Sequence, residues 1–232
     1  MTACPRLLDL FCGAGGAARG YQEAGFYVVG VDNRPQPRYA GDEFIQADAL
    51  EFMDAGGWQG FDVIHASPPC QGYSIMRNLP WLRHKEYPLL IEPVRERLQI
   101  IGLPFVIENV MGAQRKAEMR AGWLCGGMFG LPFYRHRLFE TNWPWLQPGH
   151  PRHRFTVRNG RTLGSRARDI VHNGAQKVGA NVGHAAGVQD AREAMQIDWM
   201  TRDEITQAIP PTYTEFIGKQ LMRHLRHLAE TL

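Results

Sequence analysis

The sequence predicts an α/β fold in which helices cover a mostly parallel, Rossmann-like sheet. In the first half of the chain, short apolar runs alternate with stretches of helical spacing, as in consecutive βαβ units. Several of these runs end in glycine, aspartate or proline, residues that favour a turn after a strand. The 232 residues, 44% hydrophobic and 21% charged, suit one globular domain with a full core and a small appended lobe.

Each expected element has a local reason. Strands are predicted where β-branched and aromatic residues cluster, and helices where apolar residues recur at helical spacing. Gly25 ends the first helix, and Pro210-Pro211 separates the last two. The expected strands cover residues 6–11, 27–31, 44–46, 61–65 and 104–107, and the expected helices cover 17–24, 89–101, 191–199, 203–209 and 213–228.

A change of texture after the sheet predicts a separate lobe. From about residue 144 to 189, Gly, Arg, His and Asn dominate and apolar periodicity fades. Between residues 141 and 189 there are seven Lys or Arg against one acid, Asp169, which suits a polyanion or, equally, a solvated basic loop. We therefore expect a catalytic and cofactor-binding domain over 1–140, a small irregular target-recognition lobe over 141–190, and C-terminal helices over 191–232 that complete the catalytic domain.

The cysteines and the N-terminus predict a cytoplasmic protein without a metal centre. The four cysteines lie far apart with no C-x-x-C pair, so neither a disulfide framework nor a zinc cluster is expected from their spacing. The N-terminus has no signal-peptide pattern, and no apolar run approaches the roughly 20 residues that a membrane span needs. We expect a monomer.

A glycine-rich turn predicts a nucleoside cofactor. Residues 9–16 (DLFCGAGG) place glycines after a strand and before a helix, where a ligand can approach backbone N–H groups. Asp32 ends the next strand and could accept hydrogen bonds from a ribose, and Asp48 follows the third strand. From the residues alone, Asp48 is better explained as the N-cap of a helix. The pattern lacks the G-x-G-x-x-G spacing and a P-loop lysine, which disfavours NAD and ATP.

Residues 9–16, with Gly25-Phe26 closing the helix, resemble the first motif of the cytosine-C5 DNA methyltransferases, which have the class I S-adenosylmethionine-dependent fold. The resemblance implies that Phe11 stacks on the adenine of S-adenosylmethionine, that the glycine turn holds its methionine moiety, that Asp32 binds its ribose, and that Asp48 and Ala49 contact its adenine edge. The implied cofactor site comprises Asp9, Phe11, Cys12, Gly13, Ala14, Gly15, Gly16, Asp32, Asn33, Asp48, Ala49, Pro68, Gln207 and Ile209.

The catalytic candidates follow two later strands. Cys70 lies in Pro-Pro-Cys-Gln-Gly-Tyr-Ser just past a strand, where ligands gather in an open parallel sheet. Glu108 ends another apolar strand, and Arg135 and Arg137 alternate along a later one, so both arginines should share a face or form salt bridges at a sheet edge. Cys12 and Cys125 are expected to be inert.

The chain resembles the same family in its Pro-Cys-Gln and Glu-Asn-Val motifs and in its arginine pair. Phe133 stands where the family has glutamine, and Thr206-Gln207 stands where it has Gly-Asn. The resemblance covers about residues 6–140 and 195–222. It implies that Cys70 attacks cytosine C6, with its pKa lowered by positive charge such as Arg135, that Glu108 serves N3 and the 4-amino group, and that Arg137 holds O2.

The resemblance also implies double-stranded DNA as substrate, with the target cytosine flipped out of the helix. The residues expected on DNA are Gln71, Ser74, Arg152, Arg154, Arg158 and Arg161. Three alternatives stay open: an RNA or nucleotide cytosine, a non-catalytic DNA-binding relative, and a modified sulfonium donor.

Overall fold

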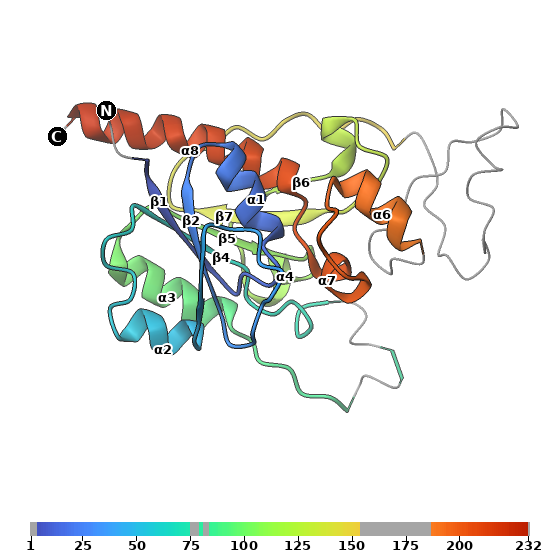
Figure 1. The fold of residues 1–232 in the computed structure, drawn as a ribbon, viewed down its shortest axis with the longest axis horizontal. Coiled ribbons are helices and arrows are strands. Elements are labelled where there is room, and N and C mark those ends of the chain that lie inside the picture. Colours follow the sequence, from blue (N-terminus) through green and yellow to red (C-terminus); the bar gives the residue numbers. More distant parts are fainter. Residues whose placement is uncertain (1–3, 75–78, 81–83, 154–186, 232) are drawn as a thin grey trace, which may run out of the picture.

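The protein is built around one seven-stranded sheet with the strand order β3-β2-β1-β4-β5-β7-β6 (Figure 1). The computed structural model describes residues 4–74, 79–80, 84–153 and 187–231. The strands are β1 (Arg6–Leu10), β2 (Tyr27–Asp32), β3 (Glu43–Gln46), β4 (Val63–Ala66), β5 (Phe105–Asn109), β6 (Ala121–Leu124) and β7 (Arg137–Thr141). Neighbouring strands run parallel from β3 to β5, whereas β7 is antiparallel to both β5 and β6.

Helices cover both faces of this sheet. In Figure 1, α1 and α8 lie together on one side of the strands, and α2 and α3 lie on the other. The helical elements are α1 (Gly16–Glu23), α2 (Ala49–Asp54), α3 (Ile91–Ile101), α4 (Ala113–Lys116), the 3-10 turn η2 (Gly126–Phe129), α6 (Val188–Met195), α7 (Arg202–Gln207) and α8 (Pro211–Thr231). None of the helices in the described part of the chain combines the length and apolarity that a membrane crossing requires.

Alternation along the strands produces two cores. Leu7 packs in one cluster with Tyr21 of α1 and Ile217 of α8, whereas the next residue, Leu8, joins the opposite cluster with Leu98 of α3. Successive side chains of a strand point to opposite faces, so a sheet covered on both faces must bury both sets. This burial explains why the strands read as nearly continuous apolar runs.

The C-terminal helix is held against the N-terminal one by a close backbone approach. A Cβ atom on Gly20 would lie 2.0 Å from the carbonyl oxygen of Pro211, so only glycine fits there. Thr214 donates its hydroxyl to the carbonyl oxygen of Ala17 over 2.9 Å. The end of the chain is thereby placed beside the turn that follows β1.

The sequence predicted most of the order but not every element. The expected parallel strands and the last helices are present, with bounds shifted by a few residues. The helix expected over 191–199 ends at Met195, because Gln196 takes the left-handed conformation (φ 58°). The short α2 was expected only as the helix that Asp48 would cap, α4 and β6 were not expected, and Arg135 lies before β7 rather than on it.

Candidate active site

The predicted site residues meet at one edge of the sheet. Strands β1, β2, β4 and β5 are parallel, so their carboxyl ends lie along the same edge. The glycine turn follows β1, Asp32 ends β2, the Cys70 loop follows β4, and Glu108 lies at the end of β5. Open α/β sheets bind their ligands at this edge.

The glycine turn after β1 is shaped by its backbone. Gly13 and Gly15 have φ values of 50° and 82°, which favour glycine. The N–H of Gly13 donates to Asp32 Oδ2 over 3.1 Å, so β2 supports the turn after β1. A Cβ atom on Gly13 would have no neighbour within 4 Å, whereas one on Gly16 would lie 2.6 Å from the carbonyl oxygen of Ile209. The turn therefore has open space at Gly13 and is packed against the 206–210 segment at Gly16.

Asp9, on β1, is a buried carboxylate that lacks a donor. Its exposed fraction is 0%, and neither of its oxygens has a hydrogen-bond partner among the described residues. Burial raises the pKa of Asp9 well above its ordinary value, and Asp32 raises it further. A buried acceptor without a donor costs roughly 1–3 kcal/mol, more if it is charged. Asp9 thus has unused hydrogen-bonding capacity directly before the glycine turn.

The other predicted cofactor residues have mixed environments. Phe11 has φ 59°, a conformation that is rare outside glycine and often found at functional sites. Asp48 caps α2, because its Oδ1 accepts from the N–H groups of Leu50 (2.9 Å) and Glu51 (3.1 Å). The alternative of a helix cap is therefore confirmed for Asp48, and its adenine contact stays a prediction. Ala49 is buried, and Asn33 and Gln207 are exposed.

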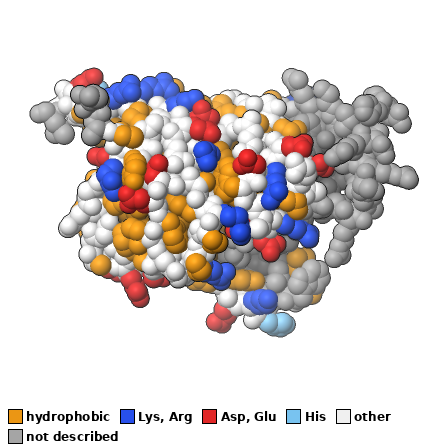
Figure 2. All heavy atoms as spheres, viewed as in Figure 1, with side chains coloured by type: hydrophobic (Ala, Val, Ile, Leu, Met, Phe, Trp, Pro, Cys, Tyr) orange, Lys and Arg blue, Asp and Glu red, His pale blue; other side chains and the backbone are white. Residues whose placement is uncertain are grey.

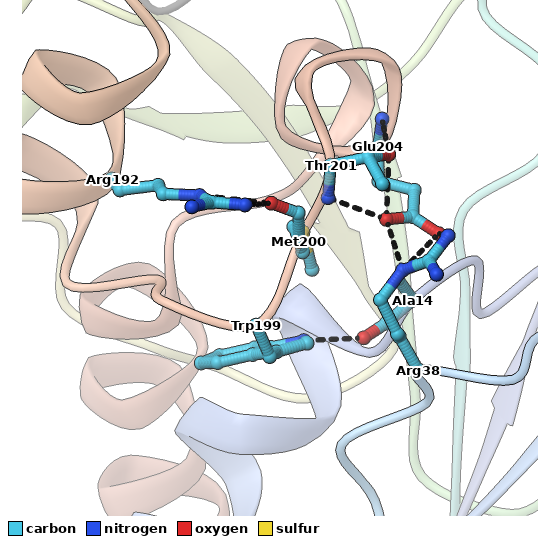
Figure 3. A network of polar contacts seen from close by, with 7 residues as sticks. All are labelled: Ala14, Arg38, Arg192, Trp199, Met200, Thr201 and Glu204. Atoms are coloured by element: carbon cyan, nitrogen blue, oxygen red, sulfur yellow. Dashed lines mark hydrogen bonds and ion pairs between the residues drawn. The ribbon is translucent and has the colours of Figure 1, made fainter.

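The C-terminal segment braces the glycine turn through a polar network (Figure 3). Trp199 donates its indole N–H to the carbonyl oxygen of Ala14 over 2.8 Å. Arg38 forms a salt bridge with Glu204 at 2.8 Å, which is the main reason that the pKa of Glu204 falls to about 2. Glu204 also closes a capping box with Thr201 at the start of α7. Residues far along the chain thus hold the cofactor turn in place.

The loop that carries Cys70 is anchored to the end of β5. Asn109 donates its side-chain N–H to the carbonyl oxygen of Pro68 over 2.9 Å, and both residues are buried. The carbonyl oxygen of Cys70 accepts from the N–H groups of Tyr73 and Ser74, each over 3.0 Å. Cys70 itself is partly buried and its neighbour Gln71 is exposed. The thiol is therefore held in a tight turn between a buried anchor and an exposed position.

Glu108 and the two arginines form the charged part of the site. Nε of Arg137 lies 2.9 Å from Oε1 of Glu108, and the two side chains are 16% and 8% exposed. Arg135 is buried, and it donates from Nη2 to the carbonyl oxygen of Thr206 over 2.7 Å. Its own carbonyl oxygen accepts from the hydroxyl of Tyr213 on α8 over 2.7 Å. The C-terminal helices therefore position Arg135.

The electrostatics differ from the prediction for Cys70. Burial raises the pKa of the Cys70 thiol, and Glu108 raises it further, while Arg137 and Arg135 lower it by less. The arginines therefore act in the expected direction, but burial and Glu108 outweigh them, so the net lowering of the Cys70 pKa expected from the sequence is not found in the free protein. Burial also raises the pKa of Glu108 against the opposing effect of both arginines. Burial first, and then Arg137, lower the pKa of Arg135 to about 9, which leaves it charged at neutral pH.

Phe133 departs from the family's motif, and Asn109 and Tyr213 are positioning residues that the sequence did not reveal. Phe133, which replaces the family's glutamine, is fully buried and packs near Tyr213. Asn109 and Tyr213 were not identified as positioning residues from the sequence. Asn109 had a usable signal, because it follows Glu108 at the strand end, whereas nothing near Tyr213 indicates its contact with Arg135.

The predicted DNA contacts are only partly within the described residues. Arg152 is exposed there, whereas Arg154, Arg158 and Arg161 lie outside them. On the face shown in Figure 2, acidic and basic side chains are interspersed over the described surface. That face alone does not mark a polyanion-binding surface.

Comparison with known proteins decides the family. A family model described as C-5 cytosine-specific DNA methylase matches residues 5–121, half of the chain. The chain belongs to this family. The matched residues include the glycine turn, Asp32, Cys70 and Glu108. The arginine pair and the C-terminal segment lie beyond the match.

Relatives of known sequence and structure agree with this assignment. The chain is 27% identical over 200 residues to Type II methyltransferase M.AgeI of Thalassovita gelatinovora, and 28% identical over 119 residues to M.XorII of Xanthomonas oryzae. These matches cover 68% and 45% of this chain but only 44% and 28% of those proteins, so the chain spans less than half the length of the curated relatives it matches.

Two solved structures share the fold of the methylase family. One is S. pombe Dnmt2 methyltransferase (TM-score 0.58, 14% identity), and the other is described as a DNA modification methyltransferase encoded within a prophage of E. coli (TM-score 0.56, 16% identity). They cover 95% and 96% of this chain, and the chain covers 99% of each. The class I methyltransferase fold predicted from the sequence is confirmed.

Proposed function

We propose that this protein transfers a methyl group from S-adenosylmethionine to C5 of a cytosine in double-stranded DNA, with Cys70 as the nucleophile. The observation that carries the proposal is the grouping of a thiol, a buried carboxyl group and two arginines at the carboxyl edge of the sheet. Cys70 responds electrostatically to Glu108, Arg137 and Arg135 together. Family membership supplies the reaction class.

The residues around the glycine turn fit S-adenosylmethionine. Asp9 offers a buried carboxyl group whose oxygens have no partner among the described residues, and Gly13 leaves open space beside the turn. Asp32 uses its carboxylate for the N–H groups of Gly13 and Arg34 and retains acceptor capacity for ribose hydroxyls. When bound, S-adenosylmethionine would supply a methyl group on an electrophilic sulfonium.

Cys70 and Glu108 would act on the cytosine ring as a coupled pair. Attack of the Cys70 thiolate on C6 forms a C–S bond and moves ring electrons toward C5, which makes C5 nucleophilic. Glu108, whose pKa is raised by burial, would carry a proton to N3 as the attack proceeds. After methylation, loss of the C5 proton restores the double bond and expels Cys70.

The coupling also addresses how a thiol of raised pKa becomes reactive. The negative charge of Glu108 is one of the causes that hold the pKa of Cys70 up. When Glu108 takes a proton, it loses the negative charge that raises the pKa of Cys70. The two arginines, which lower this pKa, are then the charged groups that remain beside the thiol. A protonated Glu108 and an ionised Cys70 therefore favour each other, and these are the two states that the reaction needs.

Arg137 and Arg135 would have different tasks. The ion pair with Glu108 places Arg137 next to the ring-binding carboxyl group, where its guanidinium could hold O2 of the cytosine. Arg135 is engaged by the carbonyl oxygen of Thr206 and would act mainly through its charge on Cys70. The target atom is inaccessible in a stacked duplex, so the base would be flipped out.

The test is to trap the covalent adduct. The protein is incubated with S-adenosylmethionine and a duplex library in which 5-fluorocytosine replaces cytosine. Fluorine at C5 cannot leave as a proton, so a protein–DNA adduct should persist through denaturation. Peptide mapping should place it on Cys70, and Cys70→Ala should abolish it while Cys4→Ala, at an exposed cysteine, retains it. Adduct of equal yield in Cys70→Ala would refute the mechanism.

RNA is the second candidate substrate, because the basic segment of the sequence suits either polymer. Matched duplex DNA, structured RNA and free cytidine nucleotides should be compared for methyl transfer. Transfer confined to RNA would overturn the choice of DNA and keep the chemistry.

A further inference from the structure

A second cluster of reactive side chains lies outside the site described above. Cys125 follows β6, His136 precedes β7, and His150 and His153 lie in the segment after β7. One ligand atom from each, the cysteine Sγ and a nitrogen of each imidazole, falls within 4.8 Å of all the others. The cysteine spacing had not indicated such a site, because three of the four donors are histidines.

The distances suit a tetrahedral metal ion. Sγ of Cys125 lies 3.6 Å from Nε2 of His153, which in turn lies 3.0 Å from Nε2 of His150. With zinc bonds of about 2.3 Å to sulfur and about 2.05 Å to nitrogen, tetrahedral geometry separates S and N by about 3.6 Å and two N atoms by about 3.3 Å. These two separations lie close to the tetrahedral values, and the wider ones in the cluster, up to 4.8 Å, would shorten by about 1 Å when an ion binds.

The surroundings hold the imidazole rings in place. Tyr134 stacks on His153 with ring centroids 3.6 Å apart and an interplanar angle of 10°. Trp123 contacts the rings of His150 at 4.8 Å and His136 at 5.3 Å. Cys125 is fully buried, which keeps its sulfur at a fixed position. Such an aromatic setting limits the rotamers of ligands that would otherwise be exposed.

We propose that Cys125, His136, His150 and His153 bind one Zn²⁺ as a structural site. One thiolate and three neutral imidazoles form a donor set that suits zinc. All four positions come from the protein, so no coordination position is open for a water nucleophile, and the site is structural rather than hydrolytic. Binding replaces the thiol proton of Cys125 with the metal and releases that proton.

The position of the ion gives it a task. His136 lies between Arg135 and Arg137, so the ion would fix the backbone that carries both arginines. His153 directly precedes residues 154–186 in the sequence, which include most of the basic residues predicted to contact DNA. The ion would thus join the arginine pair to the start of the basic segment.

Metal content of the full chain tests the proposal. The protein is purified without chelator, supplied with Zn²⁺ and separated from unbound metal by gel filtration. Elemental mass spectrometry should then find about one Zn²⁺ per chain. The variants Cys125→Ser and His150→Ala should lose it. Matched controls are Cys4→Ser and His227→Ala, at exposed positions away from the cluster, and both should keep it.

Cobalt provides a second readout that depends on the ligands themselves. Protein loaded with Co²⁺ in place of zinc should show the intense visible bands of a tetrahedral complex and a thiolate-to-cobalt band in the near ultraviolet. Cys125→Ser should lose the thiolate band. Because His150 is exposed, His150→Ala should retain its fold by circular dichroism, so that its loss of metal cannot be attributed to unfolding.

The opposite results are equally clear. Zinc content in the wild-type chain no higher than in folded His150→Ala would overturn the site. A cobalt spectrum of Cys125→Ser identical to that of the wild type would do the same. Neither result would affect the Cys70 mechanism, which the fluorocytosine adduct tests separately.

Discussion

The Cys70 loop and the Cys125 turn place the same residue type in two different surroundings. Both cysteines follow a strand of the same sheet, and burial raises the pKa of both thiols. Around Cys70 lie a carboxyl group and two guanidinium groups, whereas around Cys125 lie three imidazoles. A carboxyl group that can carry a proton, beside guanidinium groups that keep their positive charge, suits a nucleophile, and neutral nitrogen donors suit a metal ligand. The different functions proposed for the two cysteines therefore rest on their neighbours.

The sharpest test of this contrast compares Cys70→Ala with Cys125→Ala. Removing the nucleophile should reduce methyl transfer by about 10⁴-fold or more, as for other covalent catalysts. Cys125→Ala should still form the 5-fluorocytosine adduct, at a reduced rate if the arginine pair shifts. Single-turnover transfer of labelled methyl groups measures both. Equal losses in the two variants would erase the proposed distinction.

Glu108→Gln should reduce methyl transfer by about 10²-fold or more, the range for a lost general acid. Glu140→Gln is a matched control, because Glu140 is also a buried carboxylate on the sheet, paired with Arg95 at 2.6 Å. Glu140→Gln should lower the melting temperature, because it breaks a buried ion pair, but the protein that remains folded should still transfer methyl groups at nearly the wild-type rate. If both variants lost transfer equally, Glu108 would have no special role.

Asn109→Ala should loosen the Cys70 loop. Loss of the buried hydrogen bond to Pro68 should cost about 1–3 kcal/mol of unfolding free energy. Misplacement of the thiol should lower methyl transfer by about 10-fold or more. Asn142→Ala is the matched control. The Asn142 side chain also hydrogen-bonds to backbone groups, those of Phe105 and Leu103, so its loss should affect stability and not the Cys70 loop. Denaturant unfolding and transfer assays together separate the two effects.

The smallest expected effect is a pH shift at Cys70. Glu108 raises the pKa of the Cys70 thiol, so Glu108→Gln should lower this pKa and move alkylation by iodoacetamide to lower pH. Exposed Cys4 is an internal control whose profile should not move, and buried Cys125 should react slowly in both proteins. Peptide mass spectrometry across a pH series follows all three. A shift of the Cys70 profile to higher pH would contradict the coupling.

Motifs on the parallel strands could be predicted because they are local. The glycine turn, Cys70 and Glu108 each directly follow or end an apolar strand, and parallel strands bring their carboxyl ends to one edge. Chain order alone was therefore enough to gather them. The prediction of a cofactor contact was weaker for Asp48, because the same local pattern also predicts the helix cap that Asp48 forms on α2.

Contacts between distant segments could not be predicted in this way. Tyr213 and Thr206 hold Arg135 from more than seventy residues away, and Asn109 anchors Pro68 from another strand. The antiparallel pair β6–β7 brings Cys125 near His136, a partnership that no spacing rule for cysteines describes.

For this protein, the sequence by itself determined the fold class, the family resemblance and the candidates for the reacting residues, because these depend on patterns within short segments. Only the tertiary structure decided the direction of the Cys70 pKa and the existence of the Cys125 cluster. A pKa depends on burial and on charges contributed by other strands. A metal site likewise depends on donor atoms that meet only when the chain has folded.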